Sequence, residues 1–269
     1  MSGFSADWLA LREPFDLRAR SPAVLDAVAS YFARRDSVRV IDLACGAGST
    51  LRALGPRLPP RQNWTLLDND PSLLARAASM PTIRNVTVTV VARDLNRDPE
   101  AALGGAVDLV TTSALLDLVS EAWLDRVANA LTARAIPFHA ALSYDGRIAF
   151  TPPDPFDAAI VGAVNAHQRT DKGFGAALGP AAAEVALARF AALGCAAVQG
   201  TSDWQIGPAD RDMQTALLDG WASAAREIGT LPGQEITGWL ARRRAAIAAG
   251  RSSLLVGHID FFAVPSTTR

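Results

Sequence analysis

The sequence predicts an α/β protein whose seven-stranded, mostly parallel sheet is doubly wound. Apolar segments of strand length alternate with segments that begin on helix-capping residues, the first strand runs into a glycine-rich turn, and a long apolar segment closes the sequence. Alternation of this kind places helices on both faces of a sheet. No internal repeat or linker interrupts the pattern, so we expect residues 1–269 to form a single domain.

Apolar runs rich in β-branched residues mark the strands. The first run has the nearly continuous apolar character of a strand that is buried on both faces. After the fifth run, residues 144–147 predict a tight turn into a short strand at 148–151. The seven predicted strands are residues 38–43, 64–68, 86–91, 106–113, 138–143, 196–199 (with an extension through 206) and 254–264.

Capping residues mark the helix starts. Ser21 precedes Pro22, which suits the first position of a helix, and Asp70-Pro71 repeats this arrangement. Between residues 155 and 193 two helices, separated by a polar glycine-rich loop at 169–179, form an insertion relative to a minimal sheet. The predicted helices are residues 6–11, 22–32, 72–78, 121–131, 155–167, 180–193, 213–228 and 236–248.

The turn after the first strand indicates a nucleotide-binding site. Gly46 and Gly48 permit positive φ and let the backbone approach a ligand, while the helix that follows offers unpaired N–H donors. A dinucleotide fingerprint needs Gly or Ala at position 51, where this sequence has Leu51. Asp42, at the end of the strand, would repel a pyrophosphate and suits a ligand with an ammonium group.

The segment from Asp42 to Gly48 resembles the first motif of the class I S-adenosylmethionine-dependent methyltransferases. In that family an acid ending the second strand, here Asp68, accepts hydrogen bonds from both ribose hydroxyls. An Asp after the third strand, here Asp94, lies beside the adenine amino group, and the fourth strand ends at the methionine moiety. The resemblance therefore implies S-adenosylmethionine as cofactor, bound by Asp42, Ala44, Gly46, Gly48, Asp68, Asn69, Asp94, Leu95 and Ser113.

The same resemblance implies a lid that selects the acceptor. We expect it to consist of N-terminal cap helices in residues 1–35 and the inserted segment 152–194. His167, which ends the first lid helix, Tyr144 and His139 are the candidate catalytic groups, because an alcohol or ammonium acceptor must lose a proton. A basic set favours a small anionic acceptor, and its members are Arg12, Arg18, Arg169 and Lys172. Arg20 is a further candidate for the cofactor carboxylate.

Composition narrows the other possibilities. Hydrophobic residues make up 49% and the formal net charge is −1, so we expect a globular protein that binds neither nucleic acid nor membrane. The short cluster 242–244 of three arginines predicts a solvated helix face. Cys45 and Cys195 are too few for a disulfide framework, no metal-binding motif occurs, and the first residues lack a signal peptide, so we expect a cytoplasmic protein without metal.

Two other functions stay open at this point. A nicotinamide-dependent oxidoreductase would use the same turn, although Leu51 disfavours it. A non-catalytic S-adenosylmethionine-binding module would bind the cofactor without transferring the methyl group. The two predicted helices at 213–228 and 236–248 are longer than a minimal fold of this kind needs between its last two strands. We expect them to join the lid or a homodimer contact.

Overall fold

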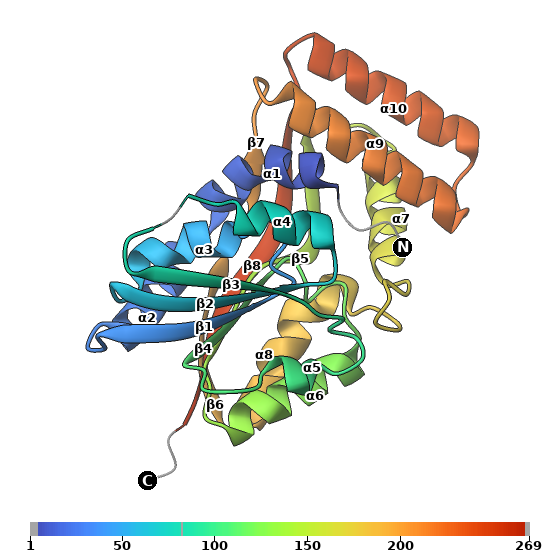
Figure 1. Cartoon of the computed structure of the whole chain (residues 1–269). Coiled ribbons are helices and arrows are strands. Elements are labelled where there is room, and N and C mark those ends of the chain that lie inside the picture. Colours follow the sequence, from blue (N-terminus) through green and yellow to red (C-terminus); the bar gives the residue numbers. More distant parts are fainter. Residues whose placement is uncertain (1–4, 82, 267–269) are drawn as a thin grey trace.

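A central sheet organises the protein, which is represented by a computed structural model that describes residues 5–81 and 83–266 (Figure 1). Its strands are β1 (Ser37–Leu43), β2 (Arg61–Asp68), β3 (Val86–Ala92), β4 (Leu109–Ser113), β5 (Phe138–Thr151), β6 (Cys195–Thr201), β7 (Trp204–Ile206) and β8 (Ser253–Pro265). The strand order is β3-β2-β1-β4-β5-β8-β6, and β7 pairs with β8 alongside this path. Strands β1 to β5 pair in parallel, whereas β8 runs antiparallel to β5, β6 and β7. The predicted fold class is therefore confirmed.

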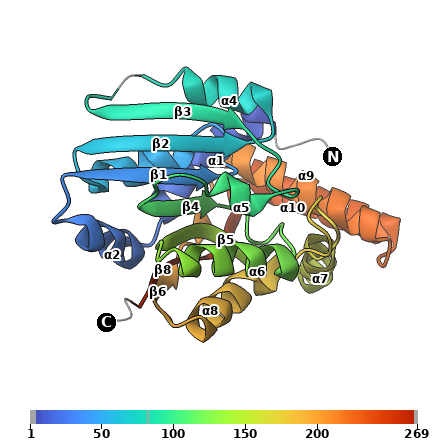
Figure 2. The ribbon, with the colours of Figure 1, turned by 60° about the horizontal axis from the view of Figure 1, so that its bottom comes forward.

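Helices cover both faces of this sheet (Figure 2). They are α1 (Ala6–Ala19), α2 (Pro22–Phe32), α3 (Ser49–Leu54), α4 (Pro71–Ala78), α5 (Pro99–Ala102), α6 (Glu121–Ala133), α7 (Asp157–Gln168), α8 (Ala182–Ala192), α9 (Arg211–Ile228) and α10 (Gly233–Ala248). Leucines, valines and aromatic residues of α2, α3 and α4 form one apolar core with the sheet, and those of α6 and α8 form a second core on the opposite face. The helix starts follow the capping residues, since Asp70 accepts the N–H of Ser72 at 2.8 Å and Ser120 accepts that of Trp123 at 3.3 Å.

The predicted turn at residues 144–147 is wrong. This segment continues β5, which pairs with β8 on both sides of it, and two register shifts absorb the extra residues. Gly146 has φ +89° and Leu142 has φ +53°, which are backbone conformations of a bulge rather than of a hairpin. The Asp-Gly pair that suggested a turn therefore bends a single long strand.

Two further boundaries differ from the prediction. Helix α1 continues to Ala19 instead of ending at Leu11, with Pro14 inside it. β7 is a separate strand rather than an extension of β6, because Ser202 and Asp203 intervene. In the predicted lid segment, α8 packs on the sheet with α6, so the part that stands over the carboxyl ends of the strands is α7 and the loop after it.

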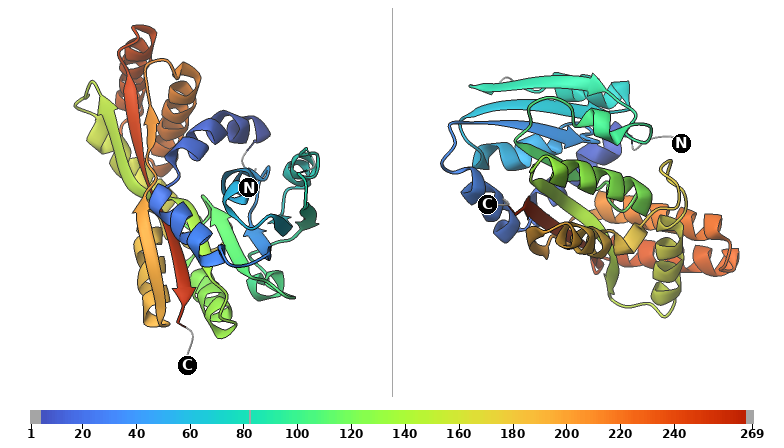
Figure 3. Two further views of the ribbon diagram at one scale, coloured as in Figure 1. Left: turned by 90° about the vertical axis from the view of Figure 1, so that its left-hand side faces the viewer. Right: turned by 90° about the horizontal axis from the view of Figure 1, so that it is seen from below.

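A third apolar core lies beyond the sheet. Strands β5 and β8 extend past the parallel strands, and their far halves combine with β7, α7, α9 and α10 to form what we call the cap lobe (Figure 3). Phe150 stacks edge to face on Trp221 and Trp239 at centroid distances of 5.6 and 6.0 Å. Helix α1 lies between the sheet and this lobe, packing on β7.

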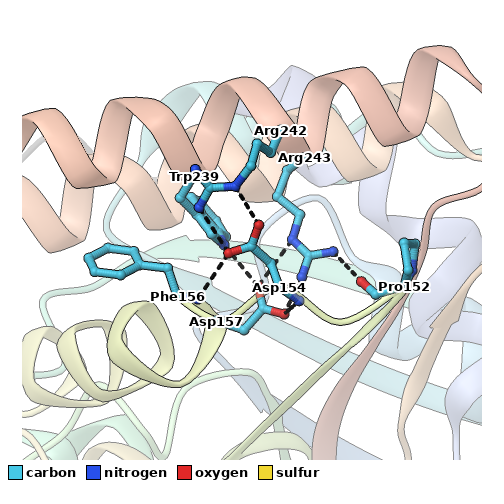
Figure 4. Close-up of polar contacts among 7 residues, drawn as sticks. All are labelled: Pro152, Asp154, Phe156, Asp157, Trp239, Arg242 and Arg243. Carbon is cyan, nitrogen blue, oxygen red and sulfur yellow. Dashed lines mark hydrogen bonds and ion pairs between the residues drawn. The ribbon is translucent and has the colours of Figure 1, made fainter.

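A buried ion pair closes the cap lobe (Figure 4). Arg243 of α10 donates two hydrogen bonds to Asp157 at the start of α7 and one to the Pro152 carbonyl at 2.6 Å, and its guanidinium lies 4.4 Å from the centre of the Phe150 ring. Trp239 donates to the same Asp157 carboxylate at 2.8 Å. The side chain of Arg243 is only 2% exposed, so the prediction of a solvated face is wrong for this residue.

None of the helices within the described residues is long and apolar enough to span a membrane.

Candidate active site

A cleft of about 1220 Å³ lies between the carboxyl ends of the strands, α1 and the cap lobe. One part of its lining is the loop after β1 with the residues that follow β2 and β3. The other part comes from α1, α7, α9 and the far halves of β5 and β8. The segment that follows β4 joins the two parts. Of the predicted site residues, the cleft brings together Arg12, Ala44, Gly46, Asp68, Asn69, Leu95, Ser113, Tyr144, His167 and Lys172.

Asp68 holds the glycine loop in place. Its two carboxylate oxygens accept the backbone N–H of Gly46 at 2.8 Å and that of Asp70 at 3.0 Å. Gly46 and Gly48 adopt φ of +54° and +83°, as the sequence predicted for this turn. Gly48 itself lies outside the lining, beneath the loop, where an added Cβ would stand 2.9 Å from Met80 Cε. One carboxylate thus fixes the turn after β1 and the start of α4.

Helix α1 covers the glycine loop. An added Cβ on Gly46 would lie 3.2 Å from Leu9 Cδ1, so the two segments are in close contact. Arg52 of α3 ties them together, because it forms an ion pair with Glu13 of α1 and donates to the Ala47 carbonyl at 2.9 Å. The N-terminal helix therefore forms one wall of the cleft.

Beneath the loop a buried carboxyl group, that of Asp42, lies near the buried guanidinium of Arg20. Asp42 is fully buried, and neither of its oxygens has a hydrogen-bond partner at good geometry within residues 5–81 and 83–266. Burial raises the pKa of Asp42 to about 8, and the charge of nearby Arg20 and the Thr50 hydroxyl offset only part of that rise. Arg20 is also buried and donates to the Ser113 hydroxyl at 3.1 Å. Asp42 and Arg20 do not line the cleft directly.

We expect Asp42→Asn to remove a pH dependence of stability. Asp42 has an ordinary pKa of 3.8, but in the folded protein it keeps its proton up to about pH 8. The folded state then binds more protons than the unfolded state, so the free energy of unfolding falls as pH rises, by up to about 1.4 kcal/mol per pH unit. Burial lowers the pKa of His139 and His258 to about 3, which gives the opposite slope below pH 6.5.

Between about pH 6.5 and 8, the effect of Asp42 on the free energy of unfolding can therefore be measured apart from the effects of His139 and His258. Urea unfolding of both proteins across this window provides the measurement. The wild-type free energy should fall with pH more steeply than that of Asp42→Asn. Parallel curves would show that Asp42 is ionised in the folded protein.

The residues after β3 divide between the cleft and solvent. Leu95 lines the cleft, and its carbonyl accepts the indole N–H of Trp123 at 2.7 Å, which fixes its position. Asp94 does not line the cleft. Its side chain is 48% exposed, accepts the N–H of Asn96 at 3.0 Å and pairs with Arg97 at 3.3 Å.

Two predicted catalytic residues line the cleft, each with its polar atoms engaged. His167 lies between Lys172, whose ammonium is 3.2 Å from Nδ1, and Glu227, whose carboxylate is 3.0 Å from Nε2. The Tyr144 hydroxyl donates to Asn165 at 2.7 Å, and burial raises its pKa. Both groups are therefore better placed to shape the cleft than to accept a proton.

The remaining histidines are buried. His139 lies within β5, away from the cleft, with Nδ1 2.9 Å from the Thr111 hydroxyl. His258 of β8 lines the cleft, and its ring centre lies 4.7 Å from that of Trp204, with the two ring planes tilted by 54°. Because burial lowers the pKa of both rings to about 3, they are neutral and weakly basic.

The predicted basic set is dispersed. Arg12 is buried and pairs with Asp16 at 3.0 Å, with its guanidinium 4.9 Å from the centre of the Trp204 ring. Arg18 stacks on Phe15 outside the cleft, and Arg169 donates to the Asn165 carbonyl, also outside it. Of the four predicted cations, only Arg12 and Lys172 reach the cleft.

Several lining residues were not predicted. Trp8, Trp204 and Trp221 stand on α1, β7 and α9 and form an aromatic wall. Asp117 lies four residues after β4 and also lines the cleft. A search for acidic residues just after the fourth predicted strand would have found Asp117, whereas the tryptophans are far apart in sequence and meet only in the fold. No cluster of three or more metal-ligating side chains occurs in the described part of the chain.

The strand order, the glycine loop after β1 and the acid that ends β2 match the fold of the class I S-adenosylmethionine-dependent methyltransferases. In agreement with this, residues 40–135 match a family of methyltransferase domains. The match covers the part of the chain that carries the glycine loop, and it agrees with the predicted methyltransferase family and with S-adenosylmethionine as the methyl donor. No curated protein matches the sequence.

Solved structures are similar to this chain at low sequence identity. A protein of Bacillus halodurans described as a methyltransferase is 14% identical with a TM-score of 0.50, over 90% of this chain and 99% of that one. The YcgJ protein of Bacillus subtilis is 15% identical with a TM-score of 0.49, over 90% and 97%. A methyltransferase of Thiobacillus denitrificans, solved with S-adenosylhomocysteine, is 15% identical with a TM-score of 0.44, over 97% and 99%.

Proposed function

We propose that this protein transfers a methyl group to a small-molecule acceptor held between the sheet and the cap lobe. The observation that carries the proposal is the continuity of the cleft, which leads from the glycine loop and Asp68 past Ser113 to the aromatic wall. A donor at one end and an acceptor at the other would meet at the segment after β4. Chemistry of this kind depends on alignment of the two reactants and on exclusion of water.

The residues of the glycine-loop half fit S-adenosylmethionine. Asp68 faces the cleft and offers carboxylate oxygens to ribose hydroxyls, while Leu95 offers an apolar surface to the adenine ring. Arg20 and Asp42 are buried beneath the loop with unpartnered polar atoms among the described residues. The Arg20 cation suits the carboxylate of the methionine moiety, and a bound ammonium group would favour the ionised form of Asp42. When bound, the cofactor supplies an electrophilic methyl group on a positively charged sulfur. Because Asp94 points to solvent, we assign the adenine contact to Leu95 rather than to Asp94.

The lining of the cleft favours a small acceptor over a nucleic acid. Acidic side chains outnumber basic ones among the lining residues, which disfavours a phosphate backbone. The anionic acceptor expected from the sequence also loses support, since Arg12 is already paired with Asp16 and both Arg18 and Arg169 lie outside the cleft.

Two further expectations stay with this proposal. Cys45 is buried in the glycine loop with a raised pKa, a state that fits the reducing cytoplasm. Helices α9 and α10, which extend beyond a minimal sheet, are the proposed contact of a homodimer, and light scattering of the purified protein at increasing concentration tests it.

Ligand-dependent stabilisation tests the proposed function. A ligand that binds only the folded state raises the unfolding midpoint as its concentration exceeds Kd. We expect S-adenosylmethionine and S-adenosylhomocysteine to raise the midpoint and NAD to leave it unchanged. A shift with NAD alone would instead support the oxidoreductase alternative. Binding of S-adenosylhomocysteine without methyl transfer to any acceptor would favour the non-catalytic module.

A further inference from the structure

We propose that Asp117 orients and deprotonates the acceptor, and that this acceptor is an uncharged aromatic molecule carrying a hydroxyl or amino group. The inference rests on the methyl transfer proposed above and adds the class of acceptor and the base. Three features carry it: an unpartnered buried carboxylate beside the cleft, an aromatic wall, and the internal pairing of the neighbouring charges.

Asp117 is held rigidly but has one free oxygen. Gln168 donates to its Oδ2 at 3.2 Å, and the backbone N–H of Gly179 donates to its carbonyl at 3.0 Å. The residue is only 6% exposed, and Oδ1 has no hydrogen-bond partner among the residues that the structure describes. A buried carboxylate oxygen without a donor is unfavourable. A ligand hydroxyl or amine that donates to Oδ1 would relieve this cost.

The surroundings of Asp117 keep it usable as a base. Burial raises its pKa to about 6, and the positive charges of Arg12 on α1 and Lys172 after α7 offset part of the effect. The Tyr144 hydroxyl on β5 also lies close enough for its charge to be affected by Asp117, and burial keeps this hydroxyl protonated. Asp117 is therefore ionised at neutral pH but close enough to neutrality to accept a proton efficiently.

The aromatic wall fits a flat ring. Trp8 and Trp204 meet edge to face at a centroid distance of 6.3 Å, and His258 lies 4.7 Å from Trp204 and 6.2 Å from Tyr144. Trp221 adds a third indole on α9, beside Ala216, Gly220 and Ala224. Small residues leave room, and the indoles offer faces and edges against which an aromatic acceptor packs favourably.

The charges around the wall are already paired, which favours a neutral acceptor. A cationic acceptor would compete with Arg12, whose guanidinium occupies the face of Trp204 at 4.9 Å. An anionic acceptor would meet the carboxylates of Asp16 and Asp117 in a poorly solvated cleft. Lys172 contacts His167 and Thr170, at 3.2 and 3.0 Å, instead of standing free.

In the proposed step, the oxygen or nitrogen of the acceptor forms a bond to the methyl carbon. The bond between that carbon and sulfur breaks, with its electron pair remaining on the sulfur. The proton of the acceptor passes to Asp117 Oδ1, so the positive charge of the sulfonium and the negative charge of the carboxylate disappear together. The protonated Asp117 then returns its proton to solvent when the product leaves.

Binding of three matched probes tests the hydrogen bond to Asp117. Isothermal titration of the protein saturated with S-adenosylhomocysteine compares 2-naphthol and 2-naphthylamine with 2-methoxynaphthalene, which has no donor. We expect at least one donor probe to bind about tenfold more tightly than the ether, and this preference to disappear in Asp117→Ala. Equal binding of all three probes, or a preference that survives in Asp117→Ala, would overturn the proposal.

Methyl transfer tests the role as a base. With radiolabelled S-adenosylmethionine and the tighter-binding probe, kcat should fall about 10²- to 10⁴-fold in the isosteric Asp117→Asn, while the affinity for S-adenosylhomocysteine stays the same. In the wild type, kcat/KM should rise with pH to a plateau above about pH 6, and this limb should vanish in the variant. Asp219→Asn, the same change on an exposed carboxylate of α9, serves as the control.

The outcomes separate this inference from the proposed function. Failure of the wild type to bind S-adenosylhomocysteine would overturn the methyl transfer itself. Binding of the cofactor product, together with an Asp117→Asn variant of unchanged rate and pH profile, would overturn only the role of Asp117. If the wild type binds a probe through Asp117 but transfers no methyl group to it, Asp117 is likewise excluded as the base.

Discussion

Asp68→Ala is expected to weaken the binding of S-adenosylhomocysteine by about 1–3 kcal/mol, which corresponds to roughly 5- to 150-fold in Kd. The variant loses the carboxylate proposed to bind the ribose hydroxyls. It also leaves the backbone N–H groups of Gly46 and Asp70 without the acceptor that now holds them at 2.8 and 3.0 Å. The variant would lose both the carboxylate that holds the glycine loop and the proposed contact with the ligand. We therefore expect the loss of binding free energy to lie near the upper end of this range.

Isothermal titration of S-adenosylhomocysteine measures the effect, and the urea midpoint without ligand shows whether the variant still folds. Asp36→Ala is the matched control, because Asp36 is an exposed carboxylate just before the amino end of β1, at the opposite edge of the sheet. Its affinity should equal that of the wild type. An unchanged Kd in a folded Asp68→Ala protein would remove Asp68 from the cofactor site.

Arg243→Met is expected to destabilise the protein by about 3–5 kcal/mol, the usual cost of breaking a buried ion pair on one side. The variant leaves the Asp157 carboxylate without its cation, with only the indole N–H of Trp239 and the backbone N–H of Asp154 still donating to it among the described residues. The Pro152 carbonyl loses its donor. It also removes a guanidinium stacked on Phe150. These contacts join α10 to the start of α7 and to the end of β5 (Figure 4).

Urea unfolding and hydrogen exchange of α10 provide the measurement. The neighbouring variant Arg242→Met is the control, because Arg242 pairs with Asp154 on the surface and its side chain is 51% exposed. It should change stability far less. The double variant Arg243→Met with Asp157→Leu should recover part of the loss, since no unpaired charge remains. Equal effects of Arg242→Met and Arg243→Met would contradict the assigned burial.

Local patterns in the sequence predicted most of the sheet. The strands around the proposed cofactor site are short apolar runs, and capping at Asp70 located the helix that follows β2. The Asp-Gly pair at 145–146 was misleading because the same residues serve a hairpin turn or a bulge, and only the partner strand decides between them. β8, more than a hundred residues further along the chain, supplies that partner.

Side-chain environments were harder to predict than backbone elements. Arg243 stands between two exposed arginines, and only its contact with Asp157 on another helix distinguishes it. Likewise Arg12 looked free in the sequence, whereas Asp16 one turn later and Trp204 from β7 enclose it. The cofactor residues follow motifs confined to a few positions each, but the acceptor side is assembled from α1, α7, β7 and α9. The residues that line the acceptor side of the cleft can therefore be identified only once the fold is known.

The position of β8 has a consequence for the order of folding during synthesis. β8 is the last of the described strands to leave the ribosome, yet it pairs with β5, β6 and β7. Strands β1 to β5 can pair as they emerge, while the edge of β5 and both later strands wait for their partner. Asp260 of β8 also accepts the backbone N–H groups of Ser21 and Leu142, at 2.9 and 2.7 Å. The closing strand thus ties early and middle segments together, and the cap lobe is completed last.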